Sequence, residues 1–437
     1  MRMKSLAAAF AGAALVAAAP AYAATEIHWW HSMGGSLGEK VKQLADEFNA
    51  SQTEYKVVPV YKGSYPVSMT AAIAAFRAGN PPDIVQVYEV GTATMMAAKG
   101  AIVPVYKLMR DSGVPFDPKA YLPAVAGYYT DTDGNMLSMP FNSSTPLFYV
   151  NKGAFKKAGL DPDKPPKTWE ELFVDAKKLK AAGQDCVYTT SWPSWIQIEN
   201  FSAWHNIPIG TEQNGMGGLD TVFEINAPLD VRHIQNLANM AKAGTFTYAG
   251  RTSQGDAKFA GGECAMFTGS AGAQGGIKKA GKVDYSVNFL PYYSDVKGAP
   301  QNSIIGGASL WVMAGKPAAD YKGVAKFFAF LSRPEVQMDW HTSTGYVPIT
   351  LAAYKLTQKS GFYDTNPGFA MAVKQLTLNP PTANSKGLRF GNYVEIRDLF
   401  KGELEAAFSG KKTAKQALDE AVKRGNEILR KFQAANR

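Results

Sequence analysis

The chain has 437 residues, a formal net charge of +9 and only two cysteines. Its basic residues are scattered rather than clustered, so nucleic acid is not expected as a partner. Two cysteines exclude a disulfide-rich scaffold, and no apolar run after residue 23 approaches the roughly 18 residues of a membrane span. A chain of this length is long enough for two or three domains, each with its own core.

The first predicted element is a secretory signal peptide over residues 1–23. Arg2 and Lys4 precede an apolar, alanine-rich run over residues 6–19, and Ala21-Tyr22-Ala23 has the small-x-small pattern of a cleavage site. The run is too short to cross a membrane, and no cysteine follows it to carry a lipid. We therefore expect cleavage after Ala23 and export to the periplasm, where the absence of ATP and NAD pools disfavours most enzyme chemistries.

Strand and helix patterns then alternate along the N-terminal part of the chain. Leu37, Val41, Leu44 and Phe48 recur at helical spacing and predict a helix with one buried face. Three strands and two further helices are predicted around it, over residues 26–30, 55–61, 84–88, 66–77 and 90–98. This βαβαβ order predicts a parallel sheet covered by helices.

A second series of elements begins near Asn151, after a hairpin turn predicted over residues 131–135. Thr168 and Glu171 form a capping box that predicts a helix over residues 169–181. Buried strands of a second sheet are predicted over residues 186–190 and 264–268. They begin with Cys186 and Cys264, which in an oxidising compartment are either bonded to each other or left as two buried thiols. The sequence leaves both alternatives open.

The C-terminal part adds one strand and two long helices. The strand is predicted over residues 303–313, and the first helix over residues 393–408. Thr413 with Gln416 opens the second helix, which we expect to end near Phe432.

These elements predict an α/β fold with two lobes about a hinge, each lobe a mostly parallel sheet flanked by helices. We assign residues 24–140 plus 305–343 to the first lobe and residues 141–304 plus 344–437 to the second. Ligands of such sheets bind in a crevice at the carboxyl ends of the strands, so the ligand site is expected between the lobes.

A search for catalytic motifs finds none that is complete. Residues 276–282 nearly spell a phosphate-binding P-loop, but Val283 stands where the motif needs Ser or Thr. His28 and His31 are three residues apart on a predicted strand and project from opposite faces, so a shared metal ion is not expected. We expect a binding protein rather than an enzyme, with no cofactor and no metal ion.

Three segments combine hydroxyl groups with glycine or bare backbone amides: residues 142–146 at a predicted lobe crossing, residues 306–309 at the start of a strand and residues 268–272 at the end of one. Their hydroxyl groups and bare backbone amides are suited to bind the oxygens of an anion. A close chain crossing that only glycine tolerates explains residues 306–309 equally well. Trp192 and Trp195 follow the strand at residues 186–190 and fit either the wall of a cleft or a packed core.

Five segments carry a resemblance to a known family: residues 61–65, 86–96, 140–146, 304–312 and 344–348. In these segments the chain resembles the periplasmic sn-glycerol-3-phosphate-binding proteins of ABC importers, within the family 1 extracellular solute-binding proteins. The likeness extends over essentially the whole mature chain. It implies a monomeric receptor that binds sn-glycerol 3-phosphate, with glycerophosphodiesters such as glycerophosphocholine as further ligands. Its implied partners are the membrane permease subunits of an ABC importer with a separate cytoplasmic ATPase.

Carried over residue by residue, the resemblance implies a ligand site lined by Tyr65, Glu89, Ser144, Trp192, Ser270, Gly307, Tyr346 and Arg397. The hydroxyl groups, the Gly307 amide and the Arg397 guanidinium are suited to donate to phosphate oxygens. An ionised Glu89 only accepts, so it suits the glycerol hydroxyls. Trp192 is suited to cover the carbon chain of the ligand.

The chain departs from the family pattern at Gly34 and Ser36, where acidic residues are expected. This departure leaves the preference between glycerol 3-phosphate and its diesters open.

Two other functions also remain. An oligosaccharide receptor would use Trp192 and Trp195 as sugar platforms, with Arg397 structural. An exported glycerophosphodiester hydrolase would need a metal cluster or a nucleophile and base, and the sequence shows neither.

Overall fold

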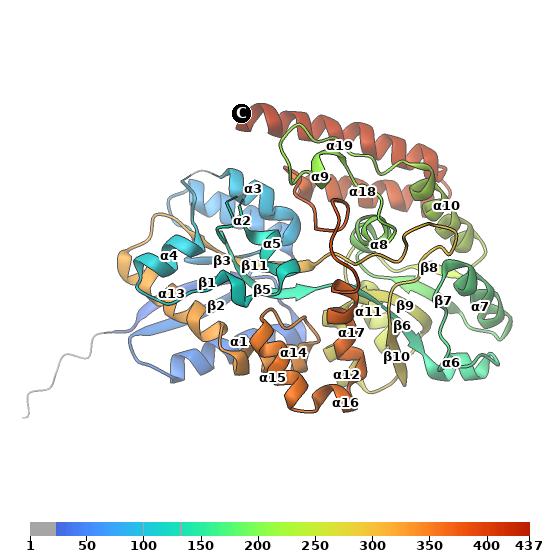
Figure 1. Cartoon of the computed structure of the whole chain (residues 1–437), viewed down its shortest axis with the longest axis horizontal. Helices are drawn as coiled ribbons and strands as arrows, with labels where there is room; N and C mark the ends of the chain where they lie inside the picture. The colour runs from blue at the N-terminus through green and yellow to red at the C-terminus, as the bar shows by residue number, and fades with distance from the viewer. Residues whose placement is uncertain (1–22, 99, 132) are drawn as a thin grey trace, which may run out of the picture.

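The structure, a computed structural model, describes residues 23–98, 100–131 and 133–437. Apart from Ala23, the predicted signal peptide lies outside the described residues. Figure 1 shows two bodies side by side, each built on a sheet with helices around it, and the C-terminal helices lie over the second body. None of the helices in the described ranges is long and apolar enough to cross a membrane.

The first body is built on a six-stranded sheet with the order β2-β1-β3-β11-β4, to which β5 adds by pairing with β11. β1 runs parallel to β2 and β3, as the βαβαβ order predicts, whereas β11 runs antiparallel to β3, β4 and β5. The strands are β1 (Thr25–His31), β2 (Tyr55–Tyr61), β3 (Ile84–Tyr88), β4 (Ile102–Val103), β5 (Met139–Ser144) and β11 (Gly306–Met313).

Helices surround this sheet. The sequence predicts the two that follow β1 and β2. The predicted helix over residues 90–98 divides into a short 3₁₀ turn, η1, and α3. The helical elements are α1 (Gly35–Ala50), α2 (Tyr65–Arg77), η1 (Glu89–Gly91), α3 (Thr92–Ala97), α4 (Val105–Asp111), η2 (Pro118–Ala120), α5 (Pro123–Tyr129), α13 (Ala318–Leu331) and α14 (Pro334–Thr344).

The second body is built on a five-stranded sheet with the order β10-β6-β9-β7-β8. β7 runs parallel to β8 and β9, while β6 runs antiparallel to β9 and β10. The strands are β6 (Pro146–Asn151), β7 (Cys186–Thr190), β8 (Phe246–Tyr248), β9 (Cys264–Ser270) and β10 (Tyr285–Asn288).

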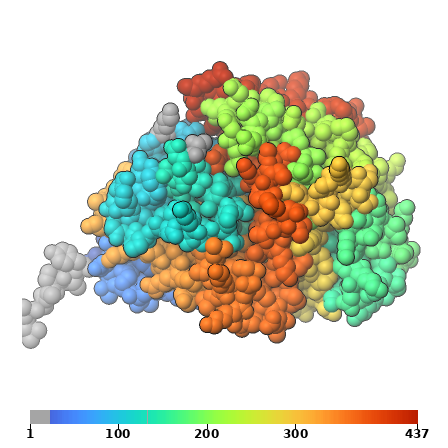
Figure 2. All heavy atoms as spheres, in the orientation of Figure 1, coloured from blue at the N-terminus to red at the C-terminus, as the bar shows by residue number. Residues whose placement is uncertain are grey.

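The helices of the second body come from two separate parts of the chain. The first part supplies α6 (Lys152–Lys157), α7 (Trp169–Ala181), the π-helix η3 (Trp195–Asn200), α8 (Phe201–Trp204), α9 (Thr211–Asn214), α10 (Pro228–Lys242), α11 (Gln254–Ala260), η4 (Ala271–Ala273) and α12 (Gln274–Ala280). The C-terminal part of the chain adds α15 (Leu351–Lys359), which packs against α14 of the first body, and then α16 (Phe362–Thr365), α17 (Pro367–Leu376), α18 (Tyr393–Phe408) and α19 (Ala414–Asn436). In Figure 2, the orange segment that includes α15, α16 and α17 covers the seam between the two bodies.

The expected two-lobe α/β fold is confirmed, but the sheets are mixed rather than mostly parallel. In the first sheet, the reason is the direction in which the chain crosses between the bodies. β3 ends at the crossing, at Tyr88, whereas β11 starts there at Gly306 and returns into the first body. Two strands that share this end of the sheet but run in opposite senses must pair antiparallel.

Two predicted helix starts are confirmed by their hydrogen bonds. Thr168 Oγ1 accepts from the Glu171 amide, and the Glu171 carboxylate accepts from the Thr168 amide at 3.1 Å, which completes the capping box of α7. Thr413 and Gln416 cap α19 in the same way, and that helix continues to Asn436, beyond the predicted end. Each box pairs two amides that would otherwise lack partners.

A single residue links the two sheets where β5 passes into β6. Ser144 pairs with Gly306 in the first sheet, and Pro146 pairs with Ser270 in the second, so only Thr145 lies between them. β5 therefore stays in the first sheet to Ser144, and the boundary predicted after residue 140 falls within this strand. The division of the chain between the lobes remains a prediction, and the β5–β6 crossing fixes where a site between them would be.

The structure joins Cys186 and Cys264 in a disulfide bond, with their Cα atoms 4.5 Å apart. The two residues are direct partners in the parallel pair β7 and β9, which brings their side chains to the same face of the sheet. Of the two alternatives that the sequence left open, the structure contains the disulfide.

We predict that reduction of this disulfide lowers the free energy of unfolding. The bond closes a loop over a sequence separation of 78 residues. The chain-entropy relation gives about 4.5 kcal/mol for a loop of that size. The measurement is urea unfolding of the protein with and without a reductant. Alkylation of the denatured, unreduced protein followed by intact-mass measurement is the control, and two added labels would contradict the disulfide.

Candidate functional site

A cavity of about 50 Å³ lies at the β5–β6 crossing, between the two sheets. All eight residues predicted for the ligand site line it, together with Tyr88 and Trp195. The lining residues are Tyr65, Tyr88, Glu89, Ser144, Trp192, Trp195, Ser270, Gly307, Tyr346 and Arg397. The structure thus brings together residues separated by more than 300 positions, and their role in binding a ligand remains a prediction.

The cavity lies at the ends of strands from both sheets. Glu89 follows β3 directly, Ser144 ends β5, and Ser270 ends β9. Trp192 lies two residues beyond the end of β7. Carboxyl ends of strands are where α/β sheets bind ligands, because the chain turns there and leaves polar groups exposed. The fold therefore explains why these positions meet.

Two serines join the sheets across the cavity. The Oγ atoms of Ser144 and Ser270 lie 2.6 Å apart, one at the end of each sheet. Ser270 Oγ also accepts from the Gly272 amide at 3.0 Å, and the Ser270 carbonyl accepts from Tyr149. Since a hydroxyl both donates and accepts, this pair is able to turn its hydrogens toward an anion without moving the backbone.

Three tyrosines form another part of the wall. The rings of Tyr65 and Tyr88 are stacked with centroids 5.0 Å apart, and the Tyr65 hydroxyl accepts from Asn142 Nδ2 at 2.9 Å. Burial raises the pKa of Tyr65 well above its ordinary value and that of Tyr346 to about 12. These phenols are therefore neutral near pH 7 and keep their hydrogens for donation.

The charged centre of the site is Arg397, which lies between two carboxylates. Its Nη2 donates to Glu89 Oε1 at 2.6 Å and to Glu199 Oε2 at 2.5 Å, and its Nε donates to Glu199 Oε1 at 2.9 Å. Tyr393 also donates to Glu199, at 3.0 Å. The side chains of Arg397, Glu89 and Glu199 are 4%, 4% and 0% exposed. No hydrogen bond joins Arg397 Nη1 to any of the residues that the structure describes.

Burial and the neighbouring charges together determine whether the pKa values of Glu89 and Arg397 rise or fall. Burial raises the pKa of Glu89, and the Arg397 charge beside it only partly offsets that. Burial alone would lower the pKa of Arg397, but the charges of Glu199 and Glu89 raise it well above its ordinary value. Arg397 is thus a fixed positive charge, while burial makes Glu89 easier to protonate than an exposed glutamate.

Trp192 and Trp195 have unusual backbone conformations. Trp192 has φ 48°, a left-handed conformation that is an outlier for a bulky residue, and Trp195 begins the π-helix η3. Strained residues and π-helical turns are concentrated at functional sites. The Trp195 indole N–H is buried and has no hydrogen-bond partner among the described residues. It is therefore a donor available to a ligand.

Gly307 is required by the close approach of two strands. Its φ is 90°, and a Cβ atom there would lie 1.9 Å from the Asn142 carbonyl oxygen. A close crossing that only glycine tolerates therefore does occur here. It coexists with a place in the cavity wall, so the two explanations offered by the sequence are compatible.

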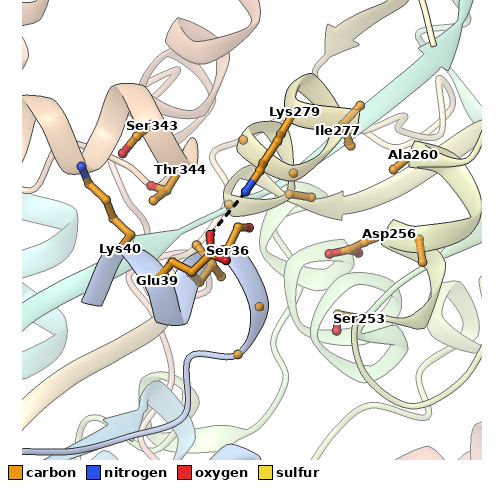
Figure 3. A pocket seen from close by; sticks show the side chains of 18 of the residues that line it. Ser36, Glu39, Lys40, Ser253, Asp256, Ala260, Ile277, Lys279, Ser343 and Thr344 are labelled. Atoms are coloured by element: carbon orange, nitrogen blue, oxygen red, sulfur yellow. Dashed lines mark hydrogen bonds and ion pairs between the residues drawn. The ribbon is translucent and has the colours of Figure 1, made fainter. Parts of the chain in front are cut away.

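Gly34 and Ser36 do not line the cavity but a wider groove of about 680 Å³. Figure 3 shows this groove between α1 of the first body and α11 and α12 of the second, with Glu39 and Lys279 forming an ion pair across it at 3.3 Å. The segment of residues 270–272 borders both spaces, since Ser270 lines the cavity and Gly272 the groove. Gly34 and Ser36, where the resemblance led us to expect acidic residues, therefore belong to the groove and not to the cavity wall.

The sequence analysis missed three residues that shape the site. Glu199 holds Arg397, Tyr88 stacks on Tyr65, and Asn142 links Tyr65 to Gln86 Nε2, which donates to Asn142 Oδ1 at 2.8 Å. Tyr88 lay inside a resembling segment, and Asn142 inside a polar one. Glu199 gave no comparable indication, because it lies outside the resembling segments and the π-helical form of its own segment is not visible in the sequence.

Comparison with known proteins places the chain in a family. The model of the family described as "Bacterial extracellular solute-binding protein" matches residues 43–371. The chain belongs to the bacterial extracellular solute-binding proteins. This solute-binding protein is 56% identical to a Pectobacterium atrosepticum protein named sn-glycerol-3-phosphate-binding periplasmic protein UgpB, over 96% of this chain and 94% of that one. It is 53% identical to the Salmonella typhimurium protein of the same name, over 99% and 97% of the two chains.

Solved structures show the same fold at lower identity. UgpB from Mycobacterium tuberculosis, in complex with glycerophosphocholine, superposes with a TM-score of 0.77 at 22% identity and covers 93% of this chain and 99% of its own. Maltose-bound MalE3 from T. maritima superposes with a TM-score of 0.76 at 18% identity, over 93% of this chain and 100% of its own. Both comparisons support the two-lobe fold of solute-binding proteins.

We predict that Arg397→Met destabilises the solute-binding protein more at high pH than at low pH. Without the guanidinium, Glu89 and Glu199 stay buried with no compensating charge, which costs about 3–5 kcal/mol when they are ionised. A carboxyl whose folded pKa is raised keeps its stability below its unfolded pKa and loses it as the pH rises through the folded value. The measurement is urea unfolding at about pH 5 and about pH 8.

Lys415→Met is the matched control, because Lys415 pairs with Asp419 on the surface of α19 with side chains 59% and 43% exposed. Its loss should change the stability by less than about 1 kcal/mol at either pH. An Arg397→Met protein as stable as the parent at both pH values would contradict the buried ion pairs.

Proposed function

We propose that this protein is an extracytoplasmic receptor that binds sn-glycerol 3-phosphate in the cavity at the β5–β6 crossing and delivers it to the permease of an ABC importer. The observation that carries the proposal is the pairing, in one cavity, of anion donors with a buried carboxylate acceptor. The ligand is bound and released without chemical change. The importer would supply its own permease subunits and a separate cytoplasmic ATPase.

Phosphate oxygens would be held by several donors at once. Arg397 offers Nη1, a charged group, and charged donors make hydrogen bonds roughly twice as strong as neutral ones. The Ser144, Ser270 and Tyr346 hydroxyls, the Gly307 amide and the Trp195 indole N–H line the same cavity. This set would surround a phosphate group with donors from both sheets.

The glycerol portion would be held by an acceptor and by ring faces. Glu89 accepts only when ionised, and its present partner is Arg397. When phosphate oxygens take up the guanidinium, Glu89 would be released to accept from the glycerol hydroxyls. Trp192 and the stacked pair of Tyr65 and Tyr88 would cover the carbon chain.

The relatives and the N-terminus support the same proposal. Proteins that share more than half of their residues with this chain over nearly their full length are named for sn-glycerol 3-phosphate and for the periplasm. Residues 1–23 have the pattern of a cleaved export signal. We accordingly place the mature protein in the periplasm, with cleavage after Ala23.

We predict that the mature protein binds sn-glycerol 3-phosphate with 1:1 stoichiometry, and glycerol far more weakly. Glycerol lacks the phosphate, so Arg397 and the hydroxyl donors would remain without their partner. A micromolar dissociation constant corresponds to about −8 kcal/mol, which is feasible for a small ligand with several charged hydrogen bonds. The measurement is isothermal titration calorimetry with sn-glycerol 3-phosphate, glycerol and maltose, followed by chemical analysis of the recovered ligand.

Two substitutions at the cavity test the phosphate contact, with Trp192→Phe as the comparison for Arg397→Met. Arg397→Met should weaken the binding of sn-glycerol 3-phosphate by roughly 10- to 150-fold, the value of a lost hydrogen bond to a charged group. Trp192→Phe keeps much of the apolar cover and should cost less. Strong binding of maltose would support the oligosaccharide receptor, and release of glycerol or phosphate would support the hydrolase.

A further inference from the structure

The buried charges at the cavity and directly behind it are one guanidinium and two carboxylates. Of its ten lining residues, Glu89 and Arg397 are the charged ones, and their charges cancel. Glu199 lies behind Arg397 and binds the same guanidinium through Nε and Nη2. All three side chains are at most 4% exposed, so water screens them little. With Glu89 ionised, the cluster formed by Glu89, Arg397 and Glu199 carries one net negative charge.

The surrounding groups do not supply a second positive charge to the cavity. Lys401 is near the cluster but does not line the cavity, and its Nζ lies 3.8 Å from Asp398. Arg251 pairs with Glu405 at 2.6 Å. Asp256, whose pKa burial raises to about 6, adds a further carboxyl near Tyr346. The remaining titratable groups that face the cluster or the cavity are Tyr65, Tyr88, Tyr128, Tyr129, Tyr346 and Tyr393, all with pKa values raised by burial.

We propose that this site selects its ligand by charge, accepting a phosphate group with one negative charge, and that Glu199 together with Glu89 excludes the doubly charged phosphate monoester. The inference rests on the proposed function and specifies the ligand class. The accepted forms are the singly protonated monoester and the phosphodiester.

The physical reason is the shortage of cations in a dry site. One guanidinium and the neutral donors are able to compensate one anionic charge on the ligand. A second charge would lie against Glu89 and Glu199 at low effective dielectric, where repulsion is much stronger than in water. The protonated monoester also carries a P–O–H group, and an ionised Glu89 is an acceptor for it. Glu199 acts through Arg397 and is therefore a positioning and specificity-determining residue.

The test compares two ligands that differ in charge state, sn-glycerol 3-phosphate and its methyl ester, sn-glycerol 3-(methyl phosphate). The monoester loses its second proton near pH 6, whereas the methyl diester stays singly charged. Calorimetric titration of the mature protein from about pH 6.5 to about pH 8.5 should show the monoester affinity falling roughly tenfold per pH unit. The diester affinity should stay nearly constant over the same range.

Two results would overturn the inference. A monoester affinity that is constant or rises with pH would show that the double charge is accepted. A diester affinity that falls in parallel would assign the pH dependence to a protein group such as Glu89 or Asp256. A failure of both ligands to bind at any pH would instead overturn the proposed function, so the two failures are distinguishable.

Glu199→Gln tests the residue assigned to this selection. Removal of its charge should raise the monoester affinity relative to the diester affinity by roughly tenfold at about pH 8.5, because the repulsion falls. Glu395→Gln is the matched control, since Glu395 is an exposed carboxylate on the same helix, α18. An unchanged ratio in Glu199→Gln would contradict the role of Glu199. If that variant does not fold, the parent's two pH profiles remain a complete test of charge selection.

Discussion

The site depends on one buried guanidinium bound by two carboxylates from different parts of the chain. Glu89 follows β3 of the first sheet, Glu199 belongs to η3 beside the second sheet, and Arg397 lies in α18. A charge so deeply buried is stable only with partners, and Glu89 and Glu199 supply them. The Glu199 contact uses Nε and Nη2 and fixes the plane of the guanidinium. The Glu89 contact is the one that a ligand phosphate would replace.

The strand crossing explains how the neutral part of the site is assembled. β5 and β6 are separated by Thr145 alone, so the ends of both sheets lie within a residue of each other. This places Ser144 and Ser270 in direct contact and brings the Gly307 backbone against Asn142. A ligand bound here touches both sheets and stabilises whichever arrangement of the lobes brings them together. β11 starts at this end of the first sheet and runs against β3, and β6 runs against β9 in the second, so both sheets are mixed.

Much of the fold could be predicted from the sequence, because local patterns determine local elements. The strands at residues 55–61, 84–88 and 186–190 and the helix at 169–181 have the predicted bounds, and the capping boxes at Thr168 and Thr413 start their helices. The parallel pairing of β1 with β2 and β3 followed from the βαβαβ order, whereas the antiparallel pairing of β11 could not be predicted, since it depends on which way the chain crosses between lobes. The eight cavity residues came from the family resemblance. The family resemblance did not include Glu199. Its role depends on a long-range ion pair, which leaves no local pattern in the sequence.

The most direct test of this account is a crystal structure of the mature protein with sn-glycerol 3-phosphate. We expect a phosphate oxygen within about 3 Å of an Arg397 Nη atom. The Arg397–Glu199 pair should be intact, and Glu89 should have turned from the guanidinium toward the glycerol hydroxyls. A phosphate group bound away from Arg397, with the Arg397–Glu89 pair unchanged, would contradict the account.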